Sequence, residues 1–148
     1  MGYMDDTLRT IAEKCGLCGA TNCIAHGTLI ETAAGQRPVE TVSVGDKLWG
    51  YDPDKREPVI VKVTKLTPSS ARETIRVGAL RVTTDHLVFA NGDWKPAGEF
   101  QAKENLLGSD LKNHVTSQIE LVSEPVEVFD IKVEQPHNFF AGDVLVRG

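Results

Sequence analysis

The pattern of hydrophobic and polar positions changes character at residue 23. From there on, short runs rich in Val, Ile, Thr and aromatic residues alternate with turns that contain Gly, Pro, Asn or Asp. Runs of this kind are typical of β-strands, and many of them in succession predict an all-β fold. The expected strands are 28–32, 39–42, 47–51, 58–66, 74–77, 80–83, 87–89, 94–95, 115–122, 126–133, 139–140 and 144–146.

The turns between these runs predict which strands pair. Asn91-Gly92-Asp93 is a strong hairpin signal, because Asn and Gly readily adopt the positive φ that tight hairpin turns require. Gly78 and Gly142 occupy similar places between neighbouring runs. No internal repeat of fixed period is evident in the sequence.

Residues 1–22 differ from the rest of the chain. The segment 5–14 predicts a short helix, because Leu8, Ile11 and Ala12 recur at helical spacing after polar N-terminal residues. Glycines at 16 and 19 then interrupt the pattern. We expect a leader over 1–22 and one domain over 23–148.

Composition excludes several function classes. The 148 residues include 16 Lys and Arg against 21 Asp and Glu, a net charge of −5 without a basic stripe, so nucleic acid is an unexpected partner. We find no apolar run long enough to cross a bilayer and no signal-peptide core at the N-terminus. We therefore expect a soluble monomer of unassigned compartment.

Four segments carry candidate chemistry. They are Cys23-Ile-Ala-His26-Gly-Thr28, Thr83-Thr-Asp-His86, Val128-Phe-Asp130-Ile-Lys-Val133, and His137-Asn-Phe-Phe-Ala-Gly142 running on to Leu145-Val-Arg147-Gly148. In this order and spacing they resemble inteins, and in particular the bacterial intein-like domains of the Hint (hedgehog/intein) superfamily. The resemblance covers 23–148. It implies a flattened horseshoe of short β-strands with pseudo-two-fold symmetry, whose two ends lie close together.

The resemblance also implies a reaction. Cys23 would attack the carbonyl carbon of Asn22, converting the Asn22–Cys23 amide to a thioester. Asp130 matches the family's aspartate near the thiol, and His86 matches the histidine that protonates the leaving amine. Thr83 would orient the scissile bond. A cis or twisted Asn22–Cys23 bond would add ground-state strain.

The end of the sequence departs from the intein pattern. His137 matches the histidine that assists cyclisation of a terminal asparagine, but Arg147 and Gly148 stand where inteins have His-Asn. Glycine has no side chain to cyclise. We therefore expect single-turnover cleavage before Cys23, with water or a small thiol as second nucleophile, the chain's own flanking polypeptide as substrate, and no cofactor.

Two alternatives remain open from the sequence. One is a catalytically inert Hint-fold module that serves as a connector or interaction domain, a possibility favoured by the missing terminal Asn. The other is zinc binding by Cys15 and Cys18 with Cys23 and His26, although a lone CxxC at this compressed spacing is a weak signal and we expect no metal. His26 and His114 are expected to be surface residues.

Overall fold

The computed structural model of the chain describes residues 22–101, 104–116 and 118–148. Within these ranges the backbone forms β-strands and two short 3-10 helices without an α-helix, which confirms the predicted all-β class. No helix in these ranges is long and apolar enough to cross a membrane. The helix expected at 5–14 and the pair Cys15 and Cys18 lie outside the described residues.

The elements follow one another with short connections. The strands of the first half are β1 (Ile24–Ala25), β2 (Leu29–Thr32), β3 (Gly35–Pro38), β4 (Lys47–Asp52), β5 (Glu57–Ala71), β6 (Thr74–Val77) and β7 (Leu80–Val82). Those of the second half are β8 (Leu87–Ala90), β9 (Asp93–Pro96), β10 (Asn105–Leu107), β11 (Asn113–Val115), β12 (Ile119–Val122), β13 (Val126–Val133), β14 (Asn138–Ala141) and β15 (Val144–Arg147). The 3-10 helices are η1 (Val39–Thr41) and η2 (Ala97–Glu99).

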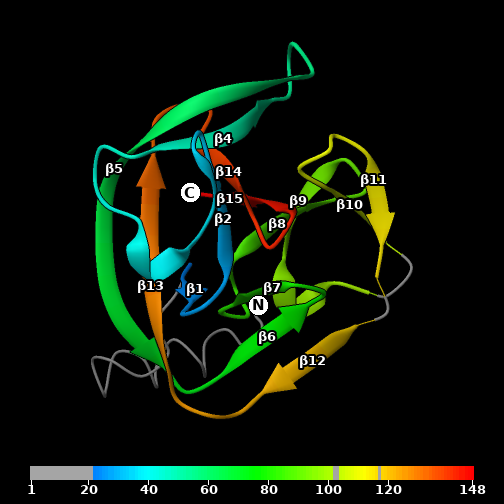
Figure 1. The fold of residues 1–148 in the computed structure, drawn as a ribbon. Coiled ribbons are helices and arrows are strands. Elements are labelled where there is room, and N and C mark those ends of the chain that lie inside the picture. The colour runs from blue at the N-terminus through cyan, green and yellow to red at the C-terminus, as the bar shows by residue number, and fades with distance from the viewer. Residues whose placement is uncertain (1–21, 102–103, 117) are drawn as a thin grey trace.

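All described strands pair in antiparallel fashion in one continuous, strongly bent sheet (Figure 1). The order is β11-β10-β8-β15-β14-β2-β4-β5-β13-β1-β7-β6-β12, with β3 beside β2 and β9 beside β8. The long strand β5 joins the two halves, because its first part pairs with β4 and its second part with β13. Figure 1 shows β5 and β13 curving together along one side of the molecule.

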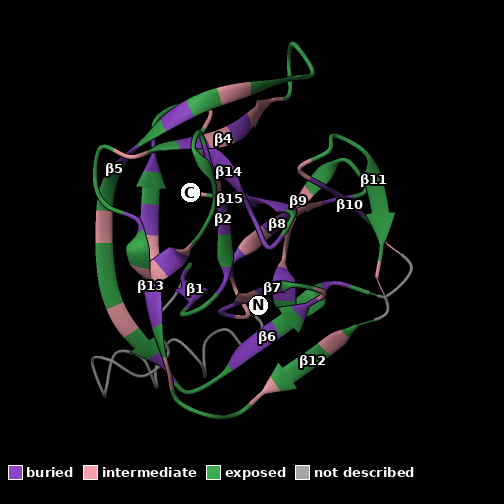
Figure 2. Ribbon diagram, in the orientation of Figure 1, coloured by how far each residue is buried: buried purple, intermediate pink, exposed green. Residues whose placement is uncertain are grey.

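The core lies at the centre of this bent sheet, where β14 and β15 run. All four residues of β14 are buried, as are the first three of β15, and Figure 2 shows the same concentration of buried positions. Strands covered on both faces read as continuous apolar runs, which explains Phe139-Phe140 and 144–146. Burying each large side chain contributes roughly 1.5–3 kcal/mol, so these two strands anchor the fold.

Two segments of the chain share one construction. In the first, the hairpin β2–β3 leads into η1; in the second, the hairpin β8–β9 leads into η2. Leu29 lies opposite Pro38 in the first hairpin, and Leu87 lies opposite Pro96 in the second. Both prolines have φ −59°, the value fixed by the ring, and both immediately precede the 3-10 helix.

The hydrogen bonds that begin the two 3-10 helices also correspond. The Val39 N–H donates to the Thr28 carbonyl and the Ala97 N–H donates to the His86 carbonyl, each at 2.8 Å. This duplication agrees with the pseudo-two-fold arrangement implied by the resemblance. Its sequence signal is the equal spacing from Leu29 to Pro38 and from Leu87 to Pro96, which a search for a fixed period does not detect.

Two of the expected strands are wrong. Residues Val39–Thr41 form η1 and Val42 follows in an extended conformation, because Pro38 turns the chain and both Val39 and Val42 are buried. The run 115–122 is not one strand, because Val115 is the last residue of β11 and only Ile119–Val122 forms β12; the two strands pair with different neighbours. At the break, the Gln118 N–H donates to Thr116 Oγ1 at 3.1 Å, a side-chain turn that ends the first strand.

Candidate active site

Cys23 lies at the point where three strands meet. In β1, Ile24 pairs with Phe129 of β13 on one side and with Val82 of β7 on the other. Both pairings are antiparallel, so continuing each register by one residue places Cys23 between Asp130 and Thr83. Residues far apart in the sequence therefore flank the cysteine because β1 is inserted between β13 and β7.

Thr83 holds Cys23 through the backbone. The Cys23 N–H donates to Thr83 Oγ1 at 3.0 Å, and the Thr83 N–H donates to the Cys23 carbonyl at 2.9 Å. Both residues are buried, Cys23 with 2% of its surface exposed and Thr83 with 3%. Because a buried N–H without an acceptor is costly, the hydroxyl fixes the amide nitrogen of the candidate scissile bond.

His86 is carried one turn further along the same segment. Its N–H donates to the Thr83 carbonyl at 3.1 Å, and its Nε2 lies 2.8 Å from the Arg147 carbonyl oxygen. A carbonyl only accepts, so Nε2 carries the proton and Nδ1 holds the lone pair when the ring is neutral. Nδ1 is buried without an aligned hydrogen bond to any described residue.

The environment of His86 favours the neutral imidazole. The residue is 1% exposed, and burial lowers its pKa. The Arg147 carbonyl, the Asp85 carboxylate, the Cys23 backbone and the Asp130 carboxylate each oppose that shift more weakly. The ring can therefore take up a proton at Nδ1 and release it again, as general acid–base catalysis requires.

The Cys23 thiol is held in its protonated form. Burial raises its pKa to about 12, and the negative charges of Asp130 and Asp85 act in the same direction. The ammonium group of Lys132 lowers the pKa of the thiol only in part. Since the thiolate is the nucleophile, attack by Cys23 requires a base beside it.

Asp130 is the carboxylate whose negative charge acts most strongly on that thiol. Its Oδ1 lies 3.2 Å from Lys132 Nζ, in an ion pair on one strand. The same oxygen is buried and makes no aligned hydrogen bond within the described ranges, so the carboxylate can accept one more proton or donor. The Lys132 ammonium group therefore lies beside the carboxylate whose charge acts on the Cys23 thiol.

Asn22 stands on the other side of the candidate scissile bond. Its N–H donates to Asp85 Oδ1 at 3.1 Å, and its φ is 54°, in the left-handed region. The expectation of a cis Asn22–Cys23 bond is wrong, because the described peptide bonds are trans except for Gln135–Pro136. The left-handed φ of Asn22 is itself a sterically unfavourable backbone conformation at this junction.

The C-terminal block meets the site through the backbone. The Gly148 N–H donates to the His137 carbonyl at 2.8 Å, and the Gly148 carbonyl accepts from the Val133 N–H at 3.3 Å. His137 is exposed, and its Nδ1 lies 2.8 Å from the Val133 carbonyl oxygen. Among the described residues its contacts are thus with the β13 end and Gly148, whereas Cys23, Thr83, His86 and Asp130 form one group.

Gly148 fits where a larger residue would not. A Cβ added to it would clash with Phe139 Cε1 and would lie 3.0 Å from the Ile131 carbonyl oxygen. Gly148 therefore packs against the Phe139 ring too closely to carry a side chain without a shift. Arg147, just before it, supplies the carbonyl for His86 and places its guanidinium 5.6 Å from the centre of the Trp94 ring.

Sequence reasoning did not single out Asp85, Lys132 or Asn138. Asp85 lies in the motif that contains Thr83, and Lys132 lies in the motif that contains Asp130. Their place inside these motifs is the sequence signal that could have identified them. Asn138 is 1% exposed, and its side chain accepts from the Tyr51 N–H at 2.8 Å and donates to the Tyr51 carbonyl at 2.9 Å. The sequence signal for Asn138 is that a polar residue directly precedes the apolar run 139–140.

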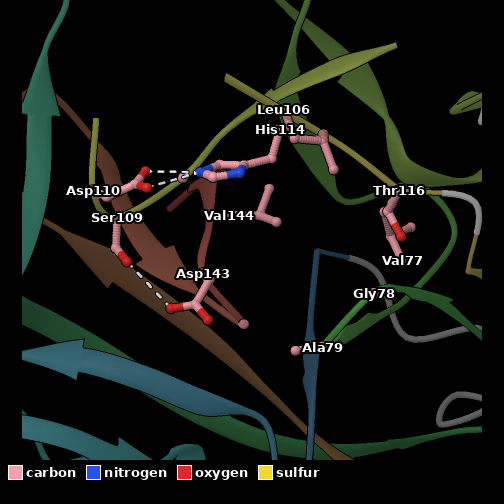
Figure 3. A pocket seen from close by; sticks show the side chains of 12 residues that line it. Val77, Gly78, Ala79, Leu106, Ser109, Asp110, His114, Thr116, Asp143 and Val144 are labelled. Atoms are coloured by element: carbon pink, nitrogen blue, oxygen red, sulfur yellow. Dashed lines mark hydrogen bonds and ion pairs between the residues drawn. The ribbon is translucent and has the colours of Figure 1, made fainter. Parts of the chain in front are cut away.

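A separate cavity of about 410 Å³ lies between the β6–β7 turn, the β10–β11 hairpin and the β14–β15 turn (Figure 3). Its polar side chains already pair with one another: Asp110 lies 2.9 Å from His114 Nε2, and Ser109 Oγ donates to Asp143 at 3.2 Å. The residues that line it do not include Cys23. Within the described ranges, no three His, Cys, Asp or Glu residues gather in a metal-binding arrangement.

Comparison with solved structures shows the same fold in intein-type domains. The bacterial intein-like domain from Clostridium thermocellum superimposes with a TM-score of 0.79 at 25% identity, over 87% of this chain and 100% of that one. The DnaX mini intein from Spirulina platensis gives 0.75 at 21% identity, over 85% of this chain and 99% of that one. The DnaB intein from Synechocystis sp. PCC 6803 gives 0.69 at 22% identity, over 85% and 97%.

The search of curated proteins finds no match. The profile of the family described as "Pretoxin HINT domain" matches residues 29–146, which is most of the chain. The resemblance to the intein and Hint superfamily is confirmed by this match together with the shared fold. The chain belongs to the pretoxin Hint domain family.

Proposed function

We propose that this domain cleaves its own backbone at the Asn22–Cys23 bond by forming a thioester. The observation that carries the proposal is the set of side chains around the Asn22–Cys23 peptide unit. Thr83 binds the amide nitrogen of Cys23, Asp130 acts on the Cys23 thiol, and the buried His86 lies one turn from Thr83. The Hint fold is consistent with autoprocessing, and this arrangement supports the specific bond.

The proposed step begins with the removal of the thiol proton. Asp130 accepts this proton, and Sγ of Cys23 attacks the carbonyl carbon of Asn22. The S–C bond forms as the C–N bond breaks, and the amide nitrogen leaves as the free α-amine of Cys23. That nitrogen needs a proton. The neutral His86 ring takes up at Nδ1 the proton that Asp130 received from the thiol, directly or through water, and then delivers it to the leaving nitrogen, so that no net proton is consumed and Asp130 returns to its carboxylate form.

The thioester then meets a second nucleophile. Water releases a fragment ending at Asn22, and a small thiol such as dithiothreitol first takes the acyl group by exchange. C-terminal cleavage and splicing are impaired in this proposal, because Gly148 offers no side-chain amide to cyclise. Its enclosure by Phe139 and Ile131 supports a structural use of the position.

The experiment follows the mass of the full chain in dithiothreitol between pH 7 and 9. We expect one product ending at Asn22 and one beginning at Cys23, and none from Cys23→Ala. His86→Gln removes the proton donor and should slow cleavage by about 10²–10⁴-fold. The matched control is His114→Gln, which changes a surface histidine outside the site and should leave the rate unchanged.

An unchanged mass over several days at every pH would overturn the proposal. That result would favour the alternative in which the domain is an inert Hint-fold module, consistent with the high pKa of the Cys23 thiol. A parallel chain with Cys15→Ser and Cys18→Ser retains Cys23 as its single thiol. Cleavage in this chain shows that Cys15 and Cys18 are not needed to form or resolve the thioester.

A further inference from the structure

The residue before the nucleophile has an uncommon backbone conformation. Asn22 has φ 54°, in the left-handed region that most side chains avoid because Cβ approaches the following carbonyl oxygen. Asn tolerates this region, and Gly adopts it without steric cost. Because Asn22 is exposed, core packing does not explain the conformation.

Hydrogen bonds to the segment 83–86 hold the chain at this point. The Asn22 N–H donates to Asp85 Oδ1 at 3.1 Å, and the Cys23 N–H donates to Thr83 Oγ1 at 3.0 Å. The carbonyl group that Cys23 would attack lies between these two N–H groups along the chain. The segment 83–86 therefore forms hydrogen bonds with the backbone on both sides of the Asn22 carbonyl carbon.

We propose that the cleavage site selects the residue before Cys23 by backbone conformation, accepting Asn or Gly and disfavouring β-branched residues. Asp85 is the positioning residue that holds this left-handed conformation through the Asn22 N–H. This inference rests on the proposed cleavage at Asn22–Cys23. Its physical basis is that φ of Asn22 sets the direction of the Asn22 N–H relative to the Cys23 N–H. Only a residue that accepts the left-handed φ can keep both hydrogen bonds to the segment 83–86 and so hold the reacting peptide unit in place.

Asp85 has a second effect that the test must separate from positioning. Its negative charge also raises the pKa of the Cys23 thiol. Asp85→Asn removes the charge and keeps a side-chain oxygen that can accept from the Asn22 N–H. Asp85→Ala removes both. A positioning role predicts that only Asp85→Ala releases Asn22, whereas a role through charge alone predicts that both variants behave alike.

The first measurement does not depend on cleavage. In the Cys23→Ala chain, which keeps the junction intact, amide hydrogen exchange of Asn22 is followed by NMR. We expect Asp85→Ala to accelerate this exchange by about three- to tenfold, the size of one modest hydrogen bond, and Asp85→Asn to retain most of the protection. Equal exchange in the chains with and without Asp85→Ala would overturn the role of Asp85.

The second measurement is the cleavage rate in dithiothreitol. We expect Asn22→Val to cleave about tenfold more slowly than the parent, the size of the left-handed penalty, and Asn22→Gly to cleave clearly faster than Asn22→Val. Asn91→Val makes the same exchange at another left-handed asparagine, with φ 52°, away from the junction. It should not slow cleavage.

The outcomes separate the two proposals. Equal rates for Asn22→Val and Asn22→Gly would overturn conformational selection while leaving cleavage itself intact. A parent chain that does not cleave overturns the proposed function, and with it the selection. In that case the exchange measurement still decides whether Asp85 holds the backbone of Asn22.

Discussion

Thr83 and Cys23 hold each other through a reciprocal pair of hydrogen bonds. The Cys23 N–H donates to Thr83 Oγ1 at 3.0 Å, and the Thr83 N–H donates to the Cys23 carbonyl at 2.9 Å. One side-chain oxygen thus takes the place of a carbonyl where β1 leaves its regular pairing with β7. The candidate scissile nitrogen is thereby fixed by a side chain of the segment 83–86.

This pair predicts the effect of removing one hydroxyl. Thr83→Val keeps the shape of the side chain but leaves the buried Cys23 N–H without its acceptor, so the free energy of unfolding should fall by about 1–3 kcal/mol. Thr83→Ser keeps the hydroxyl and should lose clearly less. Urea denaturation of the two variants measures the difference, and equal losses would show that the methyl group, not the hydroxyl, matters.

The Cys23 thiol predicts alkaline lability of the fold. Its pKa rises from 9.0 to about 12 on folding, mainly through burial and then through Asp130. Between these pH values the unfolded chain loses the proton and the native chain keeps it, so the free energy of unfolding falls with rising pH, by up to about 1.4 kcal/mol per pH unit. Below pH 9 this contribution is fully present.

Cys23→Ala removes this dependence and isolates it from other groups that titrate in alkali. Urea denaturation of both chains from pH 8 to 10.5 should give a difference in unfolding free energy that narrows as the pH rises. A difference that stays constant over this range would mean that the thiol has an ordinary pKa in the native state.

The enclosure of Gly148 predicts that a methyl group there destabilises the chain. Gly148→Ala places a Cβ against the ring of Phe139, which must shift, and overpacking of this kind costs about 1–3 kcal/mol. Phe139→Leu removes the ring atoms involved. In a double-mutant cycle we expect the cost of Gly148→Ala to be smaller in the Phe139→Leu chain. Additive losses would place the clash at the Ile131 carbonyl instead.

Gly50 predicts a larger effect, because its neighbour is backbone. A Cβ there would lie 2.5 Å from the Asn138 carbonyl oxygen and 2.8 Å from Asn138 Oδ1, so Gly50→Ala forces β4 and β14 apart. We expect a loss of about 2–3 kcal/mol in thermal or urea denaturation. Adding Asn138→Ala removes only the side-chain contact, so it should not restore stability. Full recovery in the double variant would contradict the backbone clash.

The predicted elements show where sequence patterns succeed and where they fail. The hairpins at Asn91-Gly92 and around Gly78 form as predicted, because local turn chemistry determines both. The segment 39–42 has β-favouring residues and yet forms η1, because Pro38 and the burial of Val39 decide its conformation. Run 115–122 is not one strand, because its first residue ends β11, which pairs with β10, whereas Ile119–Val122 forms β12, which pairs with β6.

The residues of the candidate site also fall into those that sequence motifs identify and those that only the structure reveals. Cys23, Thr83, His86 and Asp130 were identified from motifs, and the structure brings them together. Asp85 and Asn138 were not identified from motifs. The role of a carboxylate or amide side chain depends on which backbone group lies beside it, and only the folded chain determines that group. His137 was grouped with the catalytic residues, whereas its contacts in the described ranges are with Val133, Glu134 and Gly148.

The sequence by itself determined the all-β class, the hairpin turns and the family, because alternating apolar runs, turn residues and ordered motifs are local signals. The tertiary structure alone decided that β1 lies between β13 and β7 and so sets Cys23 between Asp130 and Thr83. It also decided the high pKa of the thiol and the left-handed backbone of Asn22. These properties depend on burial and on partners distant in the chain, which no local pattern records.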